Sequence, residues 1–431
     1  MVPKDPVCLD VAVIGGGPAG LSACLELFGR SRELKVAIFE SDDELGGMPR
    51  TCHLFFGMRD LGRLYTGPAY ARKLTDLIRK TPTEIHTRST ASAVVPGDPG
   101  QRHRITAISP DGLKTYQCLY IILATGCCES SLGERLIPST RPAGIFTTWQ
   151  LQQAVNIHHL KPGNRALVIG SEDAALSTVM TLRRAGISIV GMVEEGDELQ
   201  TYRPPARLFS FLYRYPVFKK TSVESILGTE RVEGVDLATR GSQNRLRIAC
   251  DTVILSGKFR PVSELVDHPA FQRDPSTQGP VVDMDLMTSV PNIFSAGNIL
   301  RGGDMHDLCA LEGRIAARSV LRRIESREDQ KRPWVPLRTQ PPIRFVVPQK
   351  VALDRVRRQS FWFPGVSLQV GETVKDAHLE AWSGDQKIWE KKYPRLIANH
   401  RVSVRVEEFK WRQVAPQEGI EIRLNVSGSR I

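Results

Sequence analysis

Three glycines near the start of the sequence have the spacing of a phosphate-binding turn. The segment reads Gly15-x-Gly17-x-x-Gly20. The first glycine permits a tight turn, the second lets the backbone approach a phosphate, and the third lets a helix pack closely on a strand. Twenty residues after Gly20, Glu40 can accept a hydrogen bond from a ribose hydroxyl. The spacing predicts a dinucleotide site; the alternative is a glycine turn that binds no ligand.

The segments around these glycines have the patterns of the elements that would position them. Residues 11–14 are apolar and mostly β-branched, which is typical of a buried parallel strand, and residues 21–28 have a helical pattern. A second strand is predicted over residues 35–39, directly before Glu40. In a strand–turn–helix unit of this kind, the helix N-terminus directs its N–H groups and its positive dipole end at the phosphates.

Length and composition predict an ordinary globular protein of about three domains. The chain has 431 residues, a formal net charge of +11 and a mean hydropathy of −0.21. It has no secretion signal and no apolar run of the ~20 residues that cross a bilayer, so we expect a cytoplasmic protein without a membrane span. The basic charge comes without a nucleic-acid motif, so no nucleic-acid partner is expected. The eight cysteines form no CxxC pair, so no metal site is expected in this chain.

Later motifs make a family resemblance specific. One strand ends in Ala124-Thr-Gly126, and a late segment reads Ile293-Phe-Ser-Ala-Gly-Asn298. With the first glycine turn, these motifs are similar to those of the flavoprotein superfamily that has two dinucleotide-binding domains. Within it, Cys52-His-x-x-Phe-Gly57 and Ala124-Thr-Gly-Cys-x-Glu129, among others, resemble the FAD-binding subunits of heteromeric dehydrogenases. That group includes subunits of hydrogen cyanide synthase, opine oxidase, dye-linked proline dehydrogenase and anaerobic glycerol-3-phosphate dehydrogenase-like complexes.

The resemblance implies FAD as the cofactor. It also implies an α/β fold with two Rossmann-like dinucleotide-binding domains, the second inserted in the first. The FAD-binding domain would comprise residues 1–155 and 256–330, and the second domain residues 156–255. The residues implied to hold FAD are Gly15, Gly16, Gly17, Pro18, Ala19, Gly20, Glu40, Ser41, Gly47, Met48, Ala124, Thr125, Gly126, Gly297 and Asn298.

The last part of the chain has a different pattern. Residues 366–370, 401–406 and 420–426 alternate apolar and polar side chains, as half-buried antiparallel strands do. We therefore expect a C-terminal all-β domain over residues 340–431, built as a small sandwich. Some members of the resembled group carry a cysteine-rich iron–sulfur domain in this part, but this chain has no cysteine after Cys309.

A second strand–turn–helix unit departs from the glycine pattern at one position. It reads Gly170-Ser-Glu172-Asp-Ala-Ala175, and the resemblance identifies it with the superfamily's NAD(P)-binding domain. Ala175 is tolerable in place of the third glycine, but Glu172 stands where a missing side chain lets the pyrophosphate approach. A carboxylate ~5 Å from one phosphate charge costs about 3 kcal/mol at an effective dielectric constant near 20. We therefore expect this domain to keep its fold and to have lost ordinary NAD(P)H binding.

Two histidines are candidates for chemistry beside the flavin. His53 and His306 could transfer protons or stabilise the reduced ring, and a structural hydrogen bond in a loop is an equal alternative for each. Asp307 could orient the imidazole of His306. Cys52 is not expected to work in a flavin–disulfide relay, because Gly57 stands where disulfide reductases have the second cysteine.

Three functions are compatible with the sequence. The first is an FAD-dependent oxidoreductase that transfers electrons within a heteromeric dehydrogenase or oxidase. Its partner would be a second flavoprotein subunit that oxidises an amine, an amino acid or an α-hydroxy compound, and the complex could also hold an iron–sulfur subunit. The second is a self-contained NAD(P)H-dependent flavin reductase. The third is a flavin-bearing subunit that serves assembly alone.

Overall fold

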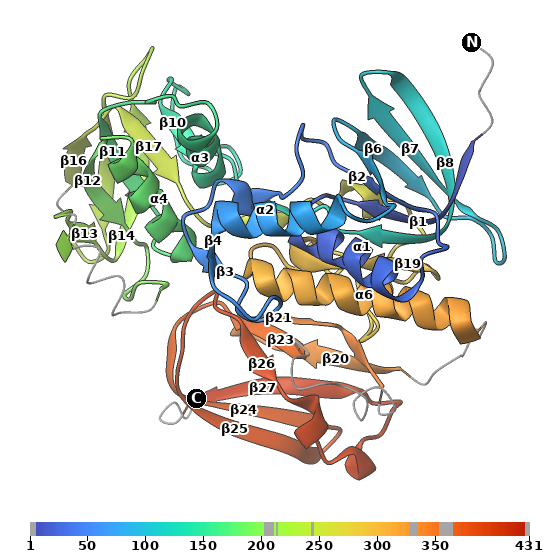
Figure 1. The fold of residues 1–431 in the computed structure, drawn as a ribbon. Helices are drawn as coiled ribbons and strands as arrows, with labels where there is room; N and C mark the ends of the chain where they lie inside the picture. The colour runs from blue at the N-terminus through green and yellow to red at the C-terminus, as the bar shows by residue number, and fades with distance from the viewer. Residues whose placement is uncertain are drawn as a thin grey trace.

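The chain forms two α/β domains and a C-terminal β domain that packs against both (Figure 1). The computed structural model describes residues 6–201, 211–212, 214–242, 245–326, 334–352 and 365–426. The ends of the expected domain spans, at residues 1–5, 327–330 and 427–431, lie outside the described residues. The expected architecture, two Rossmann-like domains with the second inserted in the first plus a C-terminal all-β domain, is confirmed.

The first domain is built on a seven-stranded sheet with the predicted first strand at its centre. The order is β5-β2-β1-β8-β7-β6, and β19 pairs with β8. The parallel strands are β1 (Val7–Ile14), β2 (Val36–Phe39), β5 (Glu84–His86), β8 (Gly112–Leu123) and β19 (Ile293–Ser295), and the antiparallel strands are β6 (Thr90–Val95) and β7 (His103–Ser109). Residues 11–14 have neighbouring strands on both sides and are buried, as their apolar sequence predicts.

Two helices pack side by side against this sheet, α1 (Pro18–Arg30) and α6 (His306–Ser326) (Figure 1). Their approach is close because α6 has Gly313 at the crossing: a Cβ atom there would lie 1.9 Å from the carbonyl oxygen of Ala19. The smaller elements are β3 (Phe55–Phe56), β4 (Tyr65–Thr66), α2 (Gly67–Ile78), and the 3-10 helices η1 (Met48–Arg50), η2 (Glu264–Val266) and η3 (Gly297–Leu300).

The second domain has a five-stranded sheet in the order β10-β17-β11-β12-β13. Its elements are β10 (Ile145–Thr147), α3 (Thr148–Asn156), β11 (Arg165–Ile169), α4 (Asp173–Arg184), β12 (Ser188–Val193), β13 (Val217–Phe218) and β17 (Thr252–Leu255), with β14 (Thr221–Leu227), β15 (Gly234–Thr239) and β16 (Arg245–Ala249) in a separate sheet. β10 pairs in parallel with β17, so this sheet includes residues 145–147, which precede the expected boundary at residue 156. The domains are connected by β9 (Cys127–Glu129) and β18 (Phe259–Pro261), which pair antiparallel.

The C-terminal domain has two sheets around one apolar core, which is the arrangement of a sandwich. Its first strand begins at Val335, slightly before the expected residue 340. One sheet has the order β22-β20-β27-β24-β25 and the other β21-β23-β26. The elements are β20 (Val335–Thr339), β21 (Ile343–Val347), β22 (Lys350–Val351), β23 (Val366–Val370), β24 (Val374–Ser383), β25 (Gln386–Leu396), β26 (Val402–Val404), η4 (Val406–Glu408), η5 (Trp411–Gln413) and β27 (Ile420–Val426).

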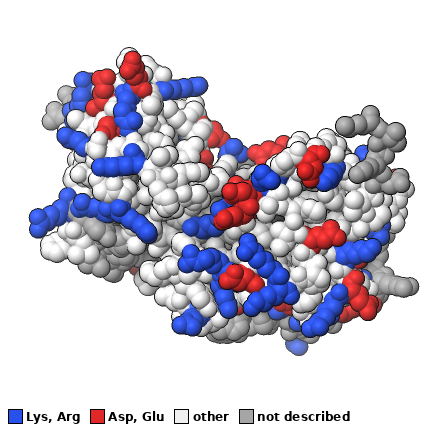
Figure 2. Space-filling model, turned by 45° about the horizontal axis from the view of Figure 1, so that its top comes forward, with Lys and Arg blue, Asp and Glu red and all other residues white. Residues whose placement is uncertain are grey.

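Charged side chains are distributed over the surface. On the face shown in Figure 2, Lys and Arg are interspersed with Asp and Glu over the α/β domains. Within the part of the chain that the structure describes, none of the helices has the length and hydrophobicity needed to span a membrane.

Candidate functional site

The first glycine turn leaves open space at one of its three positions. A Cβ atom on Gly15 would lie 2.2 Å from the carbonyl oxygen of Ala124, and one on Gly20 would lie 1.9 Å from the carbonyl oxygen of Gly15. A Cβ atom on Gly17 would have no neighbour within 4 Å. Gly15 and Gly20 are therefore required for packing, whereas Gly17 borders open space at the start of α1. No side chain caps this N-terminus, so its N–H groups can bind a phosphate.

Glu40 is fixed at the end of β2, beside the turn. Its Oε2 accepts the N–H of Gly16 at 2.8 Å, and its Oε1 accepts the N–H of Asp42 at 2.8 Å and the hydroxyl of Ser41 at 3.1 Å. The side chain is half-buried, and a carboxylate has further lone pairs for a ribose hydroxyl. Ser41 therefore orients Glu40 in this structure.

Three distant segments converge on the same turn. A Cβ atom on Gly47 would lie 3.0 Å from the Cα of Gly17, and one on Gly297 would lie 2.9 Å from the Cβ of Ala19. Since Ala124, which directly follows β8, lies against Gly15, the structure brings together the glycine turn and the segments around residues 47, 124 and 297. This cradle is glycine-rich and has an uncapped helix N-terminus and a ribose acceptor, so it fits an extended dinucleotide.

Beside the cradle lies a cavity of about 1160 Å³ at the junction of the three domains. It is large enough for a flavin ring system together with a small reactant, because ligand pockets span roughly 300–1,000 Å³. The first domain contributes Met48, Cys52, Asn298 and His306, the linker strand β9 Cys127 and Glu129, the second domain Gly170 and Glu172, and the C-terminal domain Arg344, His400 and Arg401, among others.

Of the two candidate histidines, only His306 lines this cavity. Its ring is buried and packs edge to face on Phe56, with ring centroids 4.6 Å apart. Burial lowers the pKa of His306 to about 4, so the ring is neutral at physiological pH. Asp307 does not orient this imidazole as the sequence suggested; its carboxylate binds the Arg59 guanidinium at 3.0 Å. The helix sequence explains this, because adjacent residues on a helix point in different directions.

His53 lies at the junction of the two α/β domains instead. Its Nε2 is 3.3 Å from the Nδ2 of Asn156, and its backbone N–H donates to the hydroxyl of Ser177 at 3.0 Å. Burial and the charge of Arg184 lower the pKa of His53. This geometry matches the structural hydrogen bond that the sequence left open as the alternative for His53.

Five of the eight cysteines are buried. All eight are unpaired, so there is no disulfide beside the cavity. Burial raises the pKa of Cys52, whose sulfur lies 3.6 Å from the Ser177 hydroxyl. Among the described residues, no cluster of His, Cys, Asp and Glu could hold a metal ion.

The second glycine turn is filled by the Glu172 side chain. Its Oε2 accepts the N–H of Ser171 at 3.1 Å, and its Oε1 accepts the hydroxyl of Ser256. Cβ atoms on Gly170 and Gly257 would lie 2.8 Å and 2.6 Å from the Glu172 carboxyl group, so this group is enclosed between the two glycines. Burial raises the pKa of Glu172. The carboxyl group thus occupies the space that the turn would offer to a pyrophosphate.

The second domain also has an acidic residue at its ribose position, and it is sequestered. Glu194 follows β12 and is almost fully buried. It accepts the N–H of Gly196 at 2.7 Å, the side-chain amide of Gln200 at 3.2 Å and the hydroxyl of Ser171. Unlike the half-buried Glu40, it is not accessible to a ribose hydroxyl in this arrangement.

Glu129 is a cavity residue to which sequence reasoning gave no role. It ends β9, is 8% exposed, and accepts the N–H of Trp149 at 2.8 Å. Burial raises its pKa to about 7, and the charge of Glu172 adds to this effect. The available signal was its place shortly after Ala124-Thr-Gly126, which puts it at the carboxyl end of β8.

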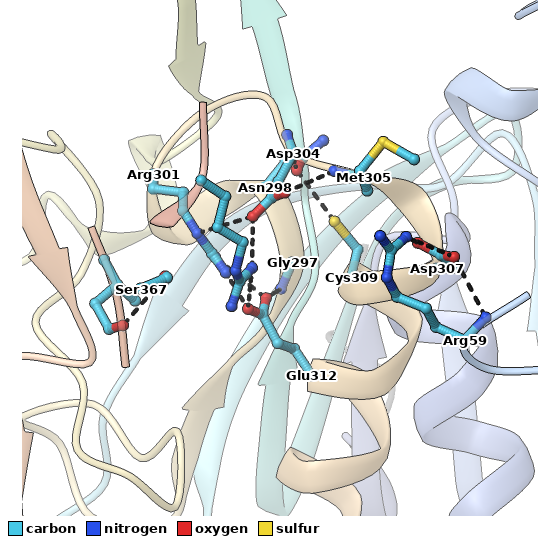
Figure 3. Close-up of polar contacts among 12 residues, drawn as sticks. Arg59, Gly297, Asn298, Arg301, Asp304, Met305, Asp307, Cys309, Glu312 and Ser367 are labelled. Atoms are coloured by element: carbon cyan, nitrogen blue, oxygen red, sulfur yellow. Dashed lines mark hydrogen bonds and ion pairs between the residues drawn. The ribbon is translucent and has the colours of Figure 1, made fainter. Parts of the chain in front are cut away.

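A buried charge cluster was also missed, because one of its members comes from the C-terminal domain. Arg301, Asp304 and Glu312 lie around Asn298 (Figure 3). Arg401, from the loop between β25 and β26, forms ion pairs with Asp304 and Glu312. The Oδ1 of Asn298 accepts the N–H of Asp304 at 3.0 Å and the thiol of Cys309 at 3.1 Å. No sequence pattern links position 401 to position 304.

Comparison with known proteins finds a matching family model and several relatives. The family model described as pyridine nucleotide-disulphide oxidoreductase matches residues 9–316, which leaves the C-terminal β domain outside the match. The chain is 22% identical to the ferredoxin--NADP reductase of Sulfurisphaera tokodaii, covering 67% of this chain and 84% of that protein. It is 23% identical to the hydrogen cyanide synthase subunit HcnB of Pseudomonas protegens, covering 73% and 70% respectively. The glutamate synthase [NADPH] small chain of Escherichia coli is 26% identical, covering 73% and 68%.

Solved structures show the same fold in the first two domains. Thioredoxin reductase from T. acidophilum superposes with a TM-score of 0.64 at 19% identity, covering 74% of this chain and 99% of that one. L-proline dehydrogenase from P. horikoshii superposes with a TM-score of 0.57 at 23% identity, covering 74% and 56%.

Proposed function

Because this chain belongs to the pyridine nucleotide-disulphide oxidoreductase family and is an FAD-dependent oxidoreductase, we propose that it is the electron-transferring subunit of a heteromeric dehydrogenase or oxidase. Two relatives support a subunit role, since one is a subunit of hydrogen cyanide synthase and another is the small chain of glutamate synthase. The proposed partner is a second flavoprotein subunit that oxidises an amine, an amino acid or an α-hydroxy compound, with an iron–sulfur subunit as a further component. A cytoplasmic location remains part of this proposal.

The proposed FAD site follows the cradle of the first domain. Glu40 would accept the adenosine ribose hydroxyls, Gly17 and the first turn of α1 would face the pyrophosphate, and Gly47 would pass beside it. Gly126, Gly297 and Asn298 would line the path toward the cavity. FAD, when bound, supplies the two-electron chemistry, and the protein orients it and excludes water.

The observation that carries the subunit proposal is the position of the Glu172 carboxyl group. It fills the second turn and receives hydrogen bonds from Ser171 and Ser256, which supports a loss of the route by which NAD(P)H reduces a flavin. Electrons must then reach the flavin from another source. Gly57 stands where disulfide reductases have the second cysteine after Cys52, so this proposal includes no disulfide relay.

Two measurements on the full chain test this proposal. In stopped-flow mixing of the FAD-loaded protein with NADH, we expect no bleaching of the flavin band near 450 nm within the roughly 1–1,000 ms of ordinary turnover. In purification from its natural source, we expect a second flavoprotein to copurify in fixed stoichiometry. Oxidation of an amine, amino acid or α-hydroxy compound by the isolated chain at a normal enzymatic rate would contradict the subunit role.

A self-contained NAD(P)H-dependent flavin reductase is the second candidate. It is favoured by the complete second sheet and by the similarity to ferredoxin--NADP reductases. Rapid bleaching by NADH or NADPH in the same stopped-flow experiment would select it over the subunit proposal.

A further inference from the structure

We infer that Arg401 makes the C-terminal β domain part of the flavin site, as a positioning residue that fixes the loop around Asn298 and balances the charge there. This inference rests on the proposed placement of FAD in the first domain, and it does not depend on the subunit role. It assigns a function to a domain that lies outside the matched family region.

The contact between the two domains is a buried ion cluster. The Arg401 Nη1 lies 2.6 Å from the Asp304 Oδ2 and 3.5 Å from the Glu312 Oε1. Arg301 pairs with the same two carboxylates, contacting Asp304 at 3.4 Å and also bonding to Glu312. The side chains of Arg301, Asp304 and Glu312 are at most 4% exposed, and that of Arg401 is 10% exposed.

The charges of this cluster cancel only when the C-terminal domain takes part. The first domain alone supplies two carboxylates and one guanidinium, which leaves one buried negative charge. Arg401 provides the second positive charge. Because removing one partner of a buried pair leaves an uncompensated charge, the first domain depends on the C-terminal domain at this point.

The cluster is directly connected to the residues that face the proposed flavin. Glu312 accepts the N–H of Gly297 at 3.0 Å, and the N–H of Asp304 donates to Asn298 at 3.0 Å. Asp304 also lies two residues before His306, the first residue of α6. Figure 3 shows Gly297, Asn298 and Asp304 gathered at this end of α6. Arg401 therefore acts on the flavin through this loop and is not itself assigned a contact with the ring.

Neighbouring residues of the same loop bind the second domain. The side-chain amide of Asn399 donates to the Gln200 Oε1 at 2.7 Å, and the His400 Nε2 lies 2.6 Å from the Gln200 carbonyl oxygen. In β25, just before this loop, the Arg395 Nη2 lies 3.4 Å from the Glu198 Oε2. One loop of the C-terminal domain thus contacts both α/β domains next to the cavity, which favours a fixed position for Arg401.

Loss of Arg401 should make the bound flavin harder to reduce. When FAD takes up two electrons and one proton, the charge of its ring system changes from zero to minus one. An extra negative charge nearby opposes this reduction. The test uses the full FAD-loaded chain equilibrated at one pH with a two-electron reference dye and a chemical reductant. For Arg401→Ala we expect the equilibrium constant for electron exchange with the dye to fall by about tenfold or more, which is about 30 mV.

Three further variants separate charge from general damage. Arg401→Lys keeps the charge and should retain most of the wild-type equilibrium constant. Arg401→Ala combined with Asp304→Asn removes one charge of each sign and should recover a value close to wild type. Arg405→Ala removes an exposed arginine that forms an ion pair with Glu408 of the same domain, and it should change nothing.

The outcomes that overturn the inference are equally specific. One is an equilibrium constant that stays unchanged in Arg401→Ala while FAD is still bound. The other is an equilibrium constant that departs further from the wild-type value in the double variant than in Arg401→Ala. If Arg401→Ala releases FAD, the charge argument requires the neutral double variant to retain it, and loss of FAD from both also overturns the inference. Because the dye replaces substrate and partner, failure here leaves the subunit proposal untouched, and the reverse also holds.

Discussion

Glu172 accepts a hydrogen bond from the Ser256 hydroxyl at the place where a dinucleotide-binding domain holds a pyrophosphate. Ser256 directly follows β17 and Glu172 directly precedes α4, so the bond crosses the carboxyl edge of the second sheet. The acidic side chain is folded into the turn rather than exposed at its rim. The domain thus retains the dinucleotide-binding fold, with a protein carboxyl group enclosed in its second glycine turn.

Glu172→Gly should restore nucleotide binding. The substitution removes both the charge and the bulk between Gly170 and Gly257, while the turn keeps its N–H groups. We expect NADH to bind at least about a hundredfold more tightly than to the wild type, which corresponds to roughly 3 kcal/mol. Titration of nicotinamide fluorescence on the FAD-loaded protein measures this.

Glu172→Gln is the matched control, because it removes the charge and keeps the side-chain volume. It should gain less affinity for NADH than Glu172→Gly, because the amide side chain still fills the space between Gly170 and Gly257. If Glu172→Gly remains correctly folded, retains FAD and shows no gain, the second domain is a structural module and not a blocked nucleotide site.

Gly17→Ala and Gly20→Ala should separate cofactor binding from folding. A Cβ atom on Gly17 has no protein neighbour within 4 Å, so the free energy of unfolding without FAD should change by less than about 1 kcal/mol. The same atom borders the proposed pyrophosphate, so the Kd for FAD should rise by about tenfold or more.

At Gly20 the added atom would lie 1.9 Å from the Gly15 carbonyl oxygen, so that variant should lose about 2 kcal/mol or more of stability. Urea unfolding of the FAD-free protein and fluorescence titration with FAD measure the two effects. Equal destabilisation by both substitutions would show that Gly17 is needed only for packing.

Local sequence patterns predicted the strand–turn–helix units, and the family resemblance supplied the arrangement of two dinucleotide-binding domains. The first turn depends on a short stretch in which Gly15, Gly17 and Gly20 each have a distinct steric role, and such roles are visible in spacing alone. The sequence did not show that residues 145–147 join the second sheet, because β10 is only three residues long and is defined by its pairing with β17. Pairing between distant segments leaves little trace in a short strand.

The environment of each side chain was harder to predict. The sequence could not show that Asp307 turns to Arg59, that His53 faces the second domain, or that Glu129 is enclosed, since these depend on how the domains meet. Arg401 is the clearest case: its partner Asp304 lies in another domain, and an arginine in an alternating strand pattern is ordinarily a solvated residue.

His306 should not act as a cationic stabiliser of the reduced flavin above about pH 5. The pKa of its imidazole is lowered from 6.5 to about 4 by burial, so the unfolded chain binds more protons than the folded one between these values. Its contribution to stability is present above pH 6.5 and is lost as the pH falls toward 4.

His306→Gln should remove the part of the pH dependence of the free energy of unfolding that His306 causes, which amounts to about 2–3 kcal/mol in wild type. Urea unfolding of the FAD-free protein at pH 7 and pH 4.5 measures it. His268→Gln is a suitable control, because His268 is exposed. A reduction equilibrium with an inflection near pH 6.5 that disappears in His306→Gln would contradict a neutral ring.

Glu129 should make the protein less stable as the pH rises, which is opposite to the effect of an ordinary salt-bridged carboxylate. Burial raises its pKa from 4.5 to about 7, so the folded chain binds more protons than the unfolded one between these values. The stability it contributes is complete below pH 4.5 and is lost as the pH rises through 7.

Glu129→Gln keeps an acceptor for the Trp149 N–H and has no charge to desolvate. The variant should therefore gain on the order of 2–3 kcal/mol relative to wild type between pH 5 and pH 8, measured by urea unfolding without FAD. Glu264→Gln, at an exposed position, should show no such trend. A constant difference between Glu129→Gln and wild type across this range would mean that Glu129 is ionised throughout, and that the cavity is wetter than its buried lining indicates.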